Sequence, residues 1–223
     1  MGHIGDEIRR LHAELDPQGV GLVAVSKFHP AEAVMQAYDA GQRIFGESRV
    51  QELVAKAGEL PSDIKWHFIG HLQTNKVRPI IGRVALIESV DSERLLEKID
   101  AESEAAGVVT KVLMQVHVAE EETKFGFTPA ELTAYFQERK FESLKATHLC
   151  GVMGMATNTE DISRVRADFK TIAELRQRIM SIAPDLRGFD TVSMGMSGDY
   201  DIAISEGSTL VRIGTTIFGD RQY

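Results

Sequence analysis

Cysteine and long apolar runs are both scarce in this chain of 223 residues. A single cysteine, Cys150, cannot form a disulfide within the chain, which fits a reducing compartment. No run approaches the roughly 20 apolar residues that a membrane-spanning helix needs. The N-terminus also lacks the basic segment followed by an apolar segment that marks a secretory signal. We therefore expect a cytoplasmic protein that does not insert into membranes.

Positive charge is in short supply as well. Lysine and arginine together number 25 against 33 aspartate and glutamate residues, which gives a formal net charge of −8. A nucleic-acid partner would need a basic face, so we expect none. A small anionic ligand is still compatible with this balance, because one pocket can be locally positive on an acidic protein.

Short apolar runs alternate with longer amphipathic runs along almost the whole chain. The runs that predict buried strands are 21–26, 43–46, 65–70, 85–90, 111–118, 147–155, 191–194 and 210–213. Helical spacing precedes the first strand, and helices are expected between the others, including a short one over 74–81 and a long one over 159–182.

This order favours an α/β fold in which residues 1–223 form a single (β/α)₈ TIM-type barrel with an additional N-terminal helix. An open, doubly wound sheet is the alternative. Eight strands without a hairpin signal favour the closed barrel.

Small and hydrogen-bonding residues follow the last two predicted strands. Ser197 lies in a loop with Met196 and two glycines, and Arg212 is followed by Gly214 and Thr215. The recurrent phosphate site of such barrels lies in these two loops, where backbone N–H groups at a helix start attract an anion. Ordinary glycine turns would give the same pattern, so the loops alone do not decide between the two.

Lys27 ends the first apolar strand, directly after Val25 and Ser26. A lysine there is expected to point over the barrel mouth, where partial burial lowers the pKa of an ammonium and exposes a nucleophilic amine. The alternative is a charge at the rim whose stem lies along apolar surface. Together with the two loops, a phosphate ligand that carries an aldehyde explains both features.

Several further segments, in order along nearly the whole chain, carry a family resemblance. They are AVSK at 24–27, FGE at 45–47, WHFIG at 66–70, LQTNK at 72–76, KFG at 124–126, GVMGM at 151–155, SMGMSGD at 193–199, VRIGT at 211–215 and IFG at 217–219. With these the chain resembles the pyridoxal 5′-phosphate (PLP) homeostasis proteins, the PLP-binding proteins of the alanine-racemase-like barrel fold.

The resemblance implies a role for each candidate site residue. Lys27 matches the lysine that holds PLP as a Schiff base. Phosphate-binding positions match Ser197, Gly214 and Thr215, with Met196 beside them. Arg212 matches an arginine near the pyridine nitrogen or the phosphate, where a cation would disfavour protonation of the nitrogen.

Three places depart from the family pattern. Ser48 stands where an asparagine is usual near the cofactor, His117 also replaces an asparagine, and Phe28-His29 replaces the commoner Thr or Val and Lys. We therefore expect the hydrogen bonds around the ring to differ from those of the family. We expect no metal site, because His67 and His71 have no cysteine or carboxylate at a known ligand spacing.

The resemblance favours storage, buffering or delivery of PLP inside the cell, with apo-forms of PLP enzymes as partners. A PLP-dependent amino-acid racemase is the alternative, and an imine-forming aldolase is a third. Related racemases carry a second, β-rich domain, whereas only residues 217–223 remain after the last predicted strand and the glycine loop that follows it. A racemase also needs a second acid/base group, for which Tyr200 and Tyr223 are weak candidates. We therefore expect a monomeric carrier that is not an enzyme.

Overall fold

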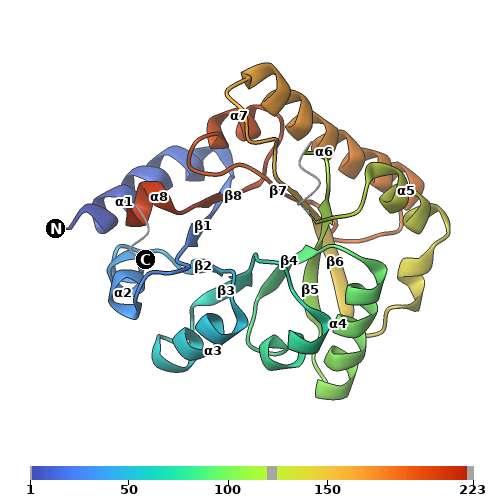
Figure 1. Cartoon of the computed structure of the whole chain (residues 1–223), viewed down its shortest axis with the longest axis horizontal. Helices are drawn as coiled ribbons and strands as arrows, with labels where there is room; N and C mark the ends of the chain where they lie inside the picture. The colour runs from blue at the N-terminus through green and yellow to red at the C-terminus, as the bar shows by residue number, and fades with distance from the viewer. Residues whose placement is uncertain (1, 120–124, 220–223) are drawn as a thin grey trace.

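The computed structural model describes residues 2–119 and 125–219. Its strands pair in parallel and in sequence order, and β1 pairs with β8, so the sheet closes into a barrel. The strands are β1 (Gly21–Val25), β2 (Ile44–Glu47), β3 (Lys65–Phe68), β4 (Leu86–Val90), β5 (Thr110–Val116), β6 (Thr147–Gly154), β7 (Thr191–Ser193) and β8 (Leu210–Ile213). Figure 1 shows them at the centre with the helices around them.

The helices follow the strands and cover the outside of the barrel. They are α1 (His3–Leu15), α2 (Ala31–Asp39), α3 (Val50–Glu59), α4 (Glu93–Ala106), α5 (Pro129–Gln137), α6 (Ile162–Ile182), α7 (Tyr200–Ser205) and α8 (Thr215–Phe218), with the short 3₁₀ segments η1 (Asp16–Gln18), η2 (Thr74–Lys76), η3 (Arg78–Ile80) and η4 (Lys140–Ser143). The extra helix α1 precedes β1 and lies beside α8 (Figure 1). The predicted (β/α)₈ barrel with an N-terminal helix is therefore confirmed.

Element boundaries differ from the prediction where local capping decides them. The long helix begins at Ile162 rather than near Thr159, because the side chain of Asp161 accepts hydrogen bonds from the N–H groups of Ser163 and Arg164. The helix expected over 74–81 is instead the pair η2 and η3, since Pro79 interrupts the segment.

Two apolar cores are found among the residues that the structure describes. The larger one lies between the barrel and the helices, and includes Phe45, Trp66 and Phe68. A smaller cluster belongs to the strands and is formed by Val23, Leu86, Leu113, Cys150, Met153 and Leu210. Cys150 is a buried free thiol, because its side chain is part of this cluster.

The apolar cluster positions the residues that follow it along each strand. Side chains two residues apart on a strand point to the same face, so Glu88 follows Leu86 inward and Arg212 follows Leu210. The barrel interior is therefore apolar toward its amino-terminal end and polar toward its carboxyl-terminal end.

Within the described residues, no helix combines the length and the apolar composition needed to cross a bilayer.

Candidate binding site at the carboxyl ends of the strands

A cavity of about 320 Å³ opens at the carboxyl-terminal end of the barrel. This volume is at the lower end of the range for small-molecule sites in proteins, about 300–1,000 Å³. Its lining residues are Val25, Lys27, His29, Ser48, Ile69, Met155, Met196, Ser197, Gly198, Arg212, Gly214, Thr215 and Gly219. All seven candidate site residues from the sequence are in this set: Lys27, Ser48, Met196, Ser197, Arg212, Gly214 and Thr215.

The loops after β7 and β8 meet at the hydroxyl of Ser197. The backbone N–H of Gly214 donates to Ser197 Oγ at 3.3 Å, and that of Thr216 donates to the same oxygen at 3.5 Å. Gly195 allows the first loop to turn, because its φ of +95° is open mainly to glycine. Two backbone donors and a hydroxyl thus converge on one point of the cavity wall, an arrangement suited to an anion.

Lys27 lies one residue beyond Ser26, which follows the last residue of β1, and its side chain is half-buried. It lines the same cavity as Ser197, Gly214 and Thr215. The Lys27 side chain and the Ser197 hydroxyl therefore line one cavity, as the sequence predicts for a lysine at the barrel mouth.

The remaining walls are close-packed and mainly apolar. Val25, Ile69 and Met155 line the cavity together with Ser48, which follows β2. The backbone of Ser48 approaches Gly70 so closely that a Cβ at Gly70 would lie 2.3 Å from the Ser48 carbonyl oxygen. The position of Ser48 in the wall therefore depends on a glycine after β3.

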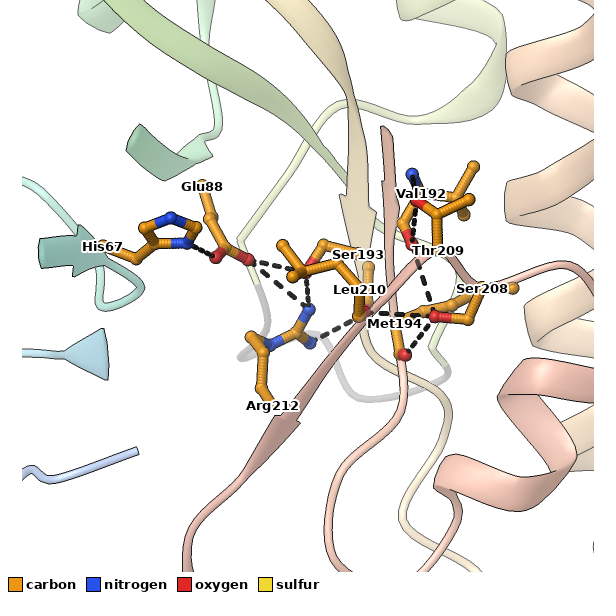
Figure 2. A network of polar contacts seen from close by, with 10 residues as sticks. His67, Glu88, Val192, Ser193, Met194, Ser208, Thr209, Leu210 and Arg212 are labelled. Atoms are coloured by element: carbon orange, nitrogen blue, oxygen red, sulfur yellow. Dashed lines mark hydrogen bonds and ion pairs between the residues drawn. The ribbon is translucent and has the colours of Figure 1, made fainter. Parts of the chain in front are cut away.

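Arg212 lines the cavity and belongs to a chain of buried polar groups, which Figure 2 shows. Its Nη1 donates to Ser193 Oγ at 2.6 Å, and Ser193 Oγ donates in turn to Glu88 Oε2 at 2.6 Å. The other carboxylate oxygen of Glu88 is 2.6 Å from His67 Nδ1. Arg212 Nη2 also donates to the carbonyl oxygen of Gly154 at 3.0 Å. The chain crosses the barrel from β8 to β3 and fixes the guanidinium.

The buried side chains of Glu88 and Arg212 carry opposite charges, and each shifts the pKa of the other. Burial raises the pKa of Glu88, but the hydrogen bonds from His67 and Ser193 and the charge of Arg212 outweigh burial and hold that pKa below its ordinary value. Burial lowers the pKa of Arg212, and the nearby Glu88 carboxylate opposes this effect. Arg212 Nη1 lies 3.8 Å from Glu88 Oε2, so the cation beside the cavity has a buried counter-ion.

A second buried charge cluster lies beneath Lys27. Lys56 of α3 is 2.7 Å from Glu47 Oε1 at the end of β2, and Ser26 Oγ donates to the same oxygen at 2.6 Å. Burial raises the pKa of Glu47 in spite of the Lys56 charge. Neither chain of charges was predicted. Both leave a sequence signal, since Glu88 interrupts an apolar strand and Lys56 lies three residues after the buried Leu53.

Other residues considered from the sequence lie elsewhere. His71 is 2.8 Å from Asp91 and stacks on Phe125, so it does not join His67. Among the described residues, no three histidine, cysteine or acidic side chains form a group that could hold a metal ion. His117 lines a different cavity, and Tyr200 donates to Glu14 at 3.3 Å. Lys124 and Tyr223 lie outside the described residues.

Comparison with known proteins agrees with this geometry. The family model described as "Alanine racemase, N-terminal domain" matches residues 1–222. The pyridoxal phosphate homeostasis protein of Aquifex aeolicus is 39% identical over 206 residues, which cover 91% of this chain and 87% of the relative. That of Pseudomonas aeruginosa is 40% identical over 209 residues, covering 93% and 87%.

Among solved structures, PipY of Synechococcus elongatus without PLP superposes with a TM-score of 0.91 at 38% identity, covering 97% of this chain and 100% of PipY. The structure of PipY with PLP bound superposes with a TM-score of 0.89 at 37% identity and the same coverage.

Proposed function

Because this chain belongs to the family of the alanine racemase N-terminal domain, and because its Lys27 and the loops after β7 and β8 line one cavity, we propose that it binds PLP and serves PLP homeostasis in the cell. The observation on which the proposal depends is that four candidate residues line the same cavity. Lys27, Ser197, Gly214 and Thr215 line one cavity although they come from opposite ends of the sequence. The pyridoxal phosphate homeostasis proteins named above, and PipY with its bound PLP, support the same ligand.

The residues present fit each part of the cofactor. The Ser197 hydroxyl offers a donor for a phosphate, and the N–H groups of Gly214 and Thr216, which donate to Ser197 Oγ in this structure, lie next to it. Val25, Ile69 and Met155 offer apolar contact to a flat ring, and Met196 lies beside the phosphate wall. Ser48 and Arg212 provide the polar groups that remain for the ring substituents and the ring nitrogen.

In the proposed complex, Lys27 would hold PLP as a Schiff base: its amine would condense with the aldehyde, and the carbonyl oxygen would be lost as water with the two hydrogens of the amine. PLP in general supplies an electron sink for reactions at amino-acid carbons. Arg212 weakens that capacity, because a cation near the ring nitrogen disfavours its protonation.

We further propose that the chain stores, buffers or delivers the cofactor rather than catalysing a reaction. Racemisation needs acid/base groups on both faces of the substrate. Within the described part of the chain, the cavity lining contains neither a tyrosine nor a carboxylate, its one imidazole, His29, stacks on Phe218, and Tyr200 contacts Glu14 instead. Apo-forms of PLP enzymes are the recipients that this role requires.

The covalent bond is tested by visible absorption of the purified protein titrated with PLP, before and after borohydride. We expect an imine band that borohydride removes in the wild type and that is absent in Lys27→Ala. Lys65→Ala is the matched control, because Lys65 is exposed at the start of β3, at the far end of the barrel. A band that persists in Lys27→Ala would overturn the assignment of this lysine.

The carrier role is tested by mixing the loaded protein with an apo-enzyme that needs PLP. Recovery of that enzyme's activity, without racemisation or transamination of free amino acids by the loaded protein itself, is the expected result. Turnover of amino acids at ordinary enzyme rates, about 1–10³ s⁻¹, would contradict the carrier assignment.

A further inference from the structure

The backbone on both sides of Lys27 is held by side chains from α3. On the amino-terminal side, Lys56 Nζ donates to the carbonyl oxygen of Ser26 at 2.8 Å. On the carboxyl-terminal side, the backbone N–H of Phe28 donates to Glu52 Oε1 at 2.7 Å. These two α3 residues are bonded to each other, with 3.1 Å between Lys56 Nζ and Glu52 Oε1. Side chains of one helix therefore bind the backbone of the residue before and of the residue after Lys27.

The backbone conformation of Phe28 explains why these two hydrogen bonds are needed. Its φ of +67° lies in the left-handed region, which non-glycine residues rarely adopt. The Glu52 carboxylate binds the N–H of this residue, and the guanidinium of Arg49 lies 4.7 Å from the centre of its ring. A strained residue directly after Lys27 persists only when surrounding contacts determine it, and these contacts come from the start of α3.

Lys56 itself is engaged in this role. Its ammonium has three N–H donors, and it binds the Ser26 carbonyl, Glu47 and Glu52. Its side chain is only 8% exposed, and it does not line the cavity. Lys56 is therefore a poor rival to Lys27 for an aldehyde, although both amines lie near the end of β1.

We propose that Lys56 and Glu52 are positioning residues that hold the Ser26–Phe28 backbone so that the Lys27 amine meets the aldehyde carbon of the ligand. This inference rests on the proposed function and names residues that act on Lys27 through its neighbours. Helix α3 thereby determines the position of the amine that forms the covalent bond with PLP, while the loops after β7 and β8 bind its phosphate.

The test compares two ligands that share a phosphate. PLP can condense with an amine, whereas pyridoxine 5′-phosphate carries an alcohol in place of the aldehyde and cannot. The ratio of their affinities therefore measures the contribution of the covalent bond, and damage to the whole pocket would weaken both ligands together. Both affinities are measured by titration of the intact chain.

Glu52→Ala is the informative variant, because Lys56→Met would leave Glu47 buried without its cation and could prevent folding. The Glu52 side chain is 21% exposed, so its removal leaves the core intact. We expect the preference for PLP to fall about tenfold, less than the roughly 100-fold loss of rate that a misplacement of about 1 Å can cause between reacting groups. Affinity for pyridoxine 5′-phosphate should stay within about twofold, a change too small to indicate a lost contact.

Two further variants separate positioning from stability. Glu52→Gln keeps an oxygen that can accept from the Phe28 N–H, so it should retain most of the preference for PLP. Leu53→Ala removes a buried neighbour on α3 that has no part in the cluster, so it should lower the melting temperature and leave the preference unchanged.

A Glu52→Ala protein with the wild-type preference would overturn the inference and leave the proposed function intact. Loss of the preference in Leu53→Ala to the same extent would also overturn it, because stability alone would then explain the effect. A wild type that binds both ligands equally would refute the Schiff base on Lys27, and with it the premise of the inference.

Discussion

Replacing Glu88 with glutamine removes one charge from the buried chain and exchanges one of its two acceptor oxygens for an amide donor. Glu88 is fully buried and Arg212 is 4% exposed, so neither charge can be compensated by water in the folded state. With 3.8 Å between Arg212 Nη1 and Glu88 Oε2, the attraction is about 4 kcal/mol at an effective dielectric constant of about 20. Removing one partner of a buried pair generally destabilises a protein by about 3–5 kcal/mol, which agrees with this value.

Urea unfolding of the Glu88→Gln protein measures this effect. We expect a loss of about 3–5 kcal/mol in the free energy of unfolding with an unchanged slope, and a fall in melting temperature of roughly 10 °C. Glu104→Gln is the matched control, because its ion pair with Lys145 is exposed, at 52% and 67% for the two side chains. That variant should lose less than about 1 kcal/mol.

A double-variant cycle isolates the pair itself. Adding Arg212→Met to Glu88→Gln removes the unpaired cation, so the combined loss should be smaller than the sum of the single losses by at least about 1 kcal/mol. Equal stabilities of Glu88→Gln and Glu104→Gln would refute the reasoning. Strict additivity in the cycle would refute the coupling between Glu88 and Arg212.

Three further predictions concern acid stability, thiol reactivity and the first phosphate loop. The folded pKa of Glu88 lies below its ordinary value of 4.5, so its stabilising contribution is complete above that pH and is lost as the pH falls through the folded pKa. The free energy of unfolding, measured between pH 5 and pH 3, should therefore fall less steeply with decreasing pH in Glu88→Gln than in the wild type. Parallel declines of the two free energies would contradict this. Burial raises the pKa of the Cys150 thiol, so a thiol reagent at pH 8 should react slowly with the native protein and rapidly after unfolding, and equal rates would count against a buried thiol. At Gly195, a Cβ would lie 2.7 Å from the Cβ of Ala203, and φ is +95°, so Gly195→Ala should destabilise the protein by about 1–3 kcal/mol and weaken phosphate-dependent binding. Unchanged calorimetric stability and unchanged PLP affinity in Gly195→Ala would contradict it.

The order of the elements could be predicted because each strand carries its own signal. The first strand is apolar over Gly21–Val25 and is followed by Pro30, so both its burial and the start of α2 can be derived from local sequence. The site followed from the same order, since parallel strands bring the residues after each strand to one end of the barrel. Lys27 and Gly214 could thus be assigned to one cavity without coordinates.

The buried charges could not be predicted in the same way. Whether Glu88 points into the barrel or toward the helices depends on the strand register, and its partners on β7 and β8 depend on closure of the sheet. Lys56 lies on a helix whose polar positions normally face water, and it meets Glu47 only after α3 packs against β2. These contacts are tertiary, so a local pattern gives the residue type and not the partner.

Peptide mapping of the borohydride-reduced complex tests the central claim most directly. After reduction of the protein with bound PLP and proteolysis, mass spectrometry locates the lysine that carries the phosphopyridoxyl group. We expect that group on the peptide containing Lys27, in a stoichiometry close to one per chain. Its location on another lysine, or an unmodified Lys27 at saturating PLP, would contradict the assignment of the site.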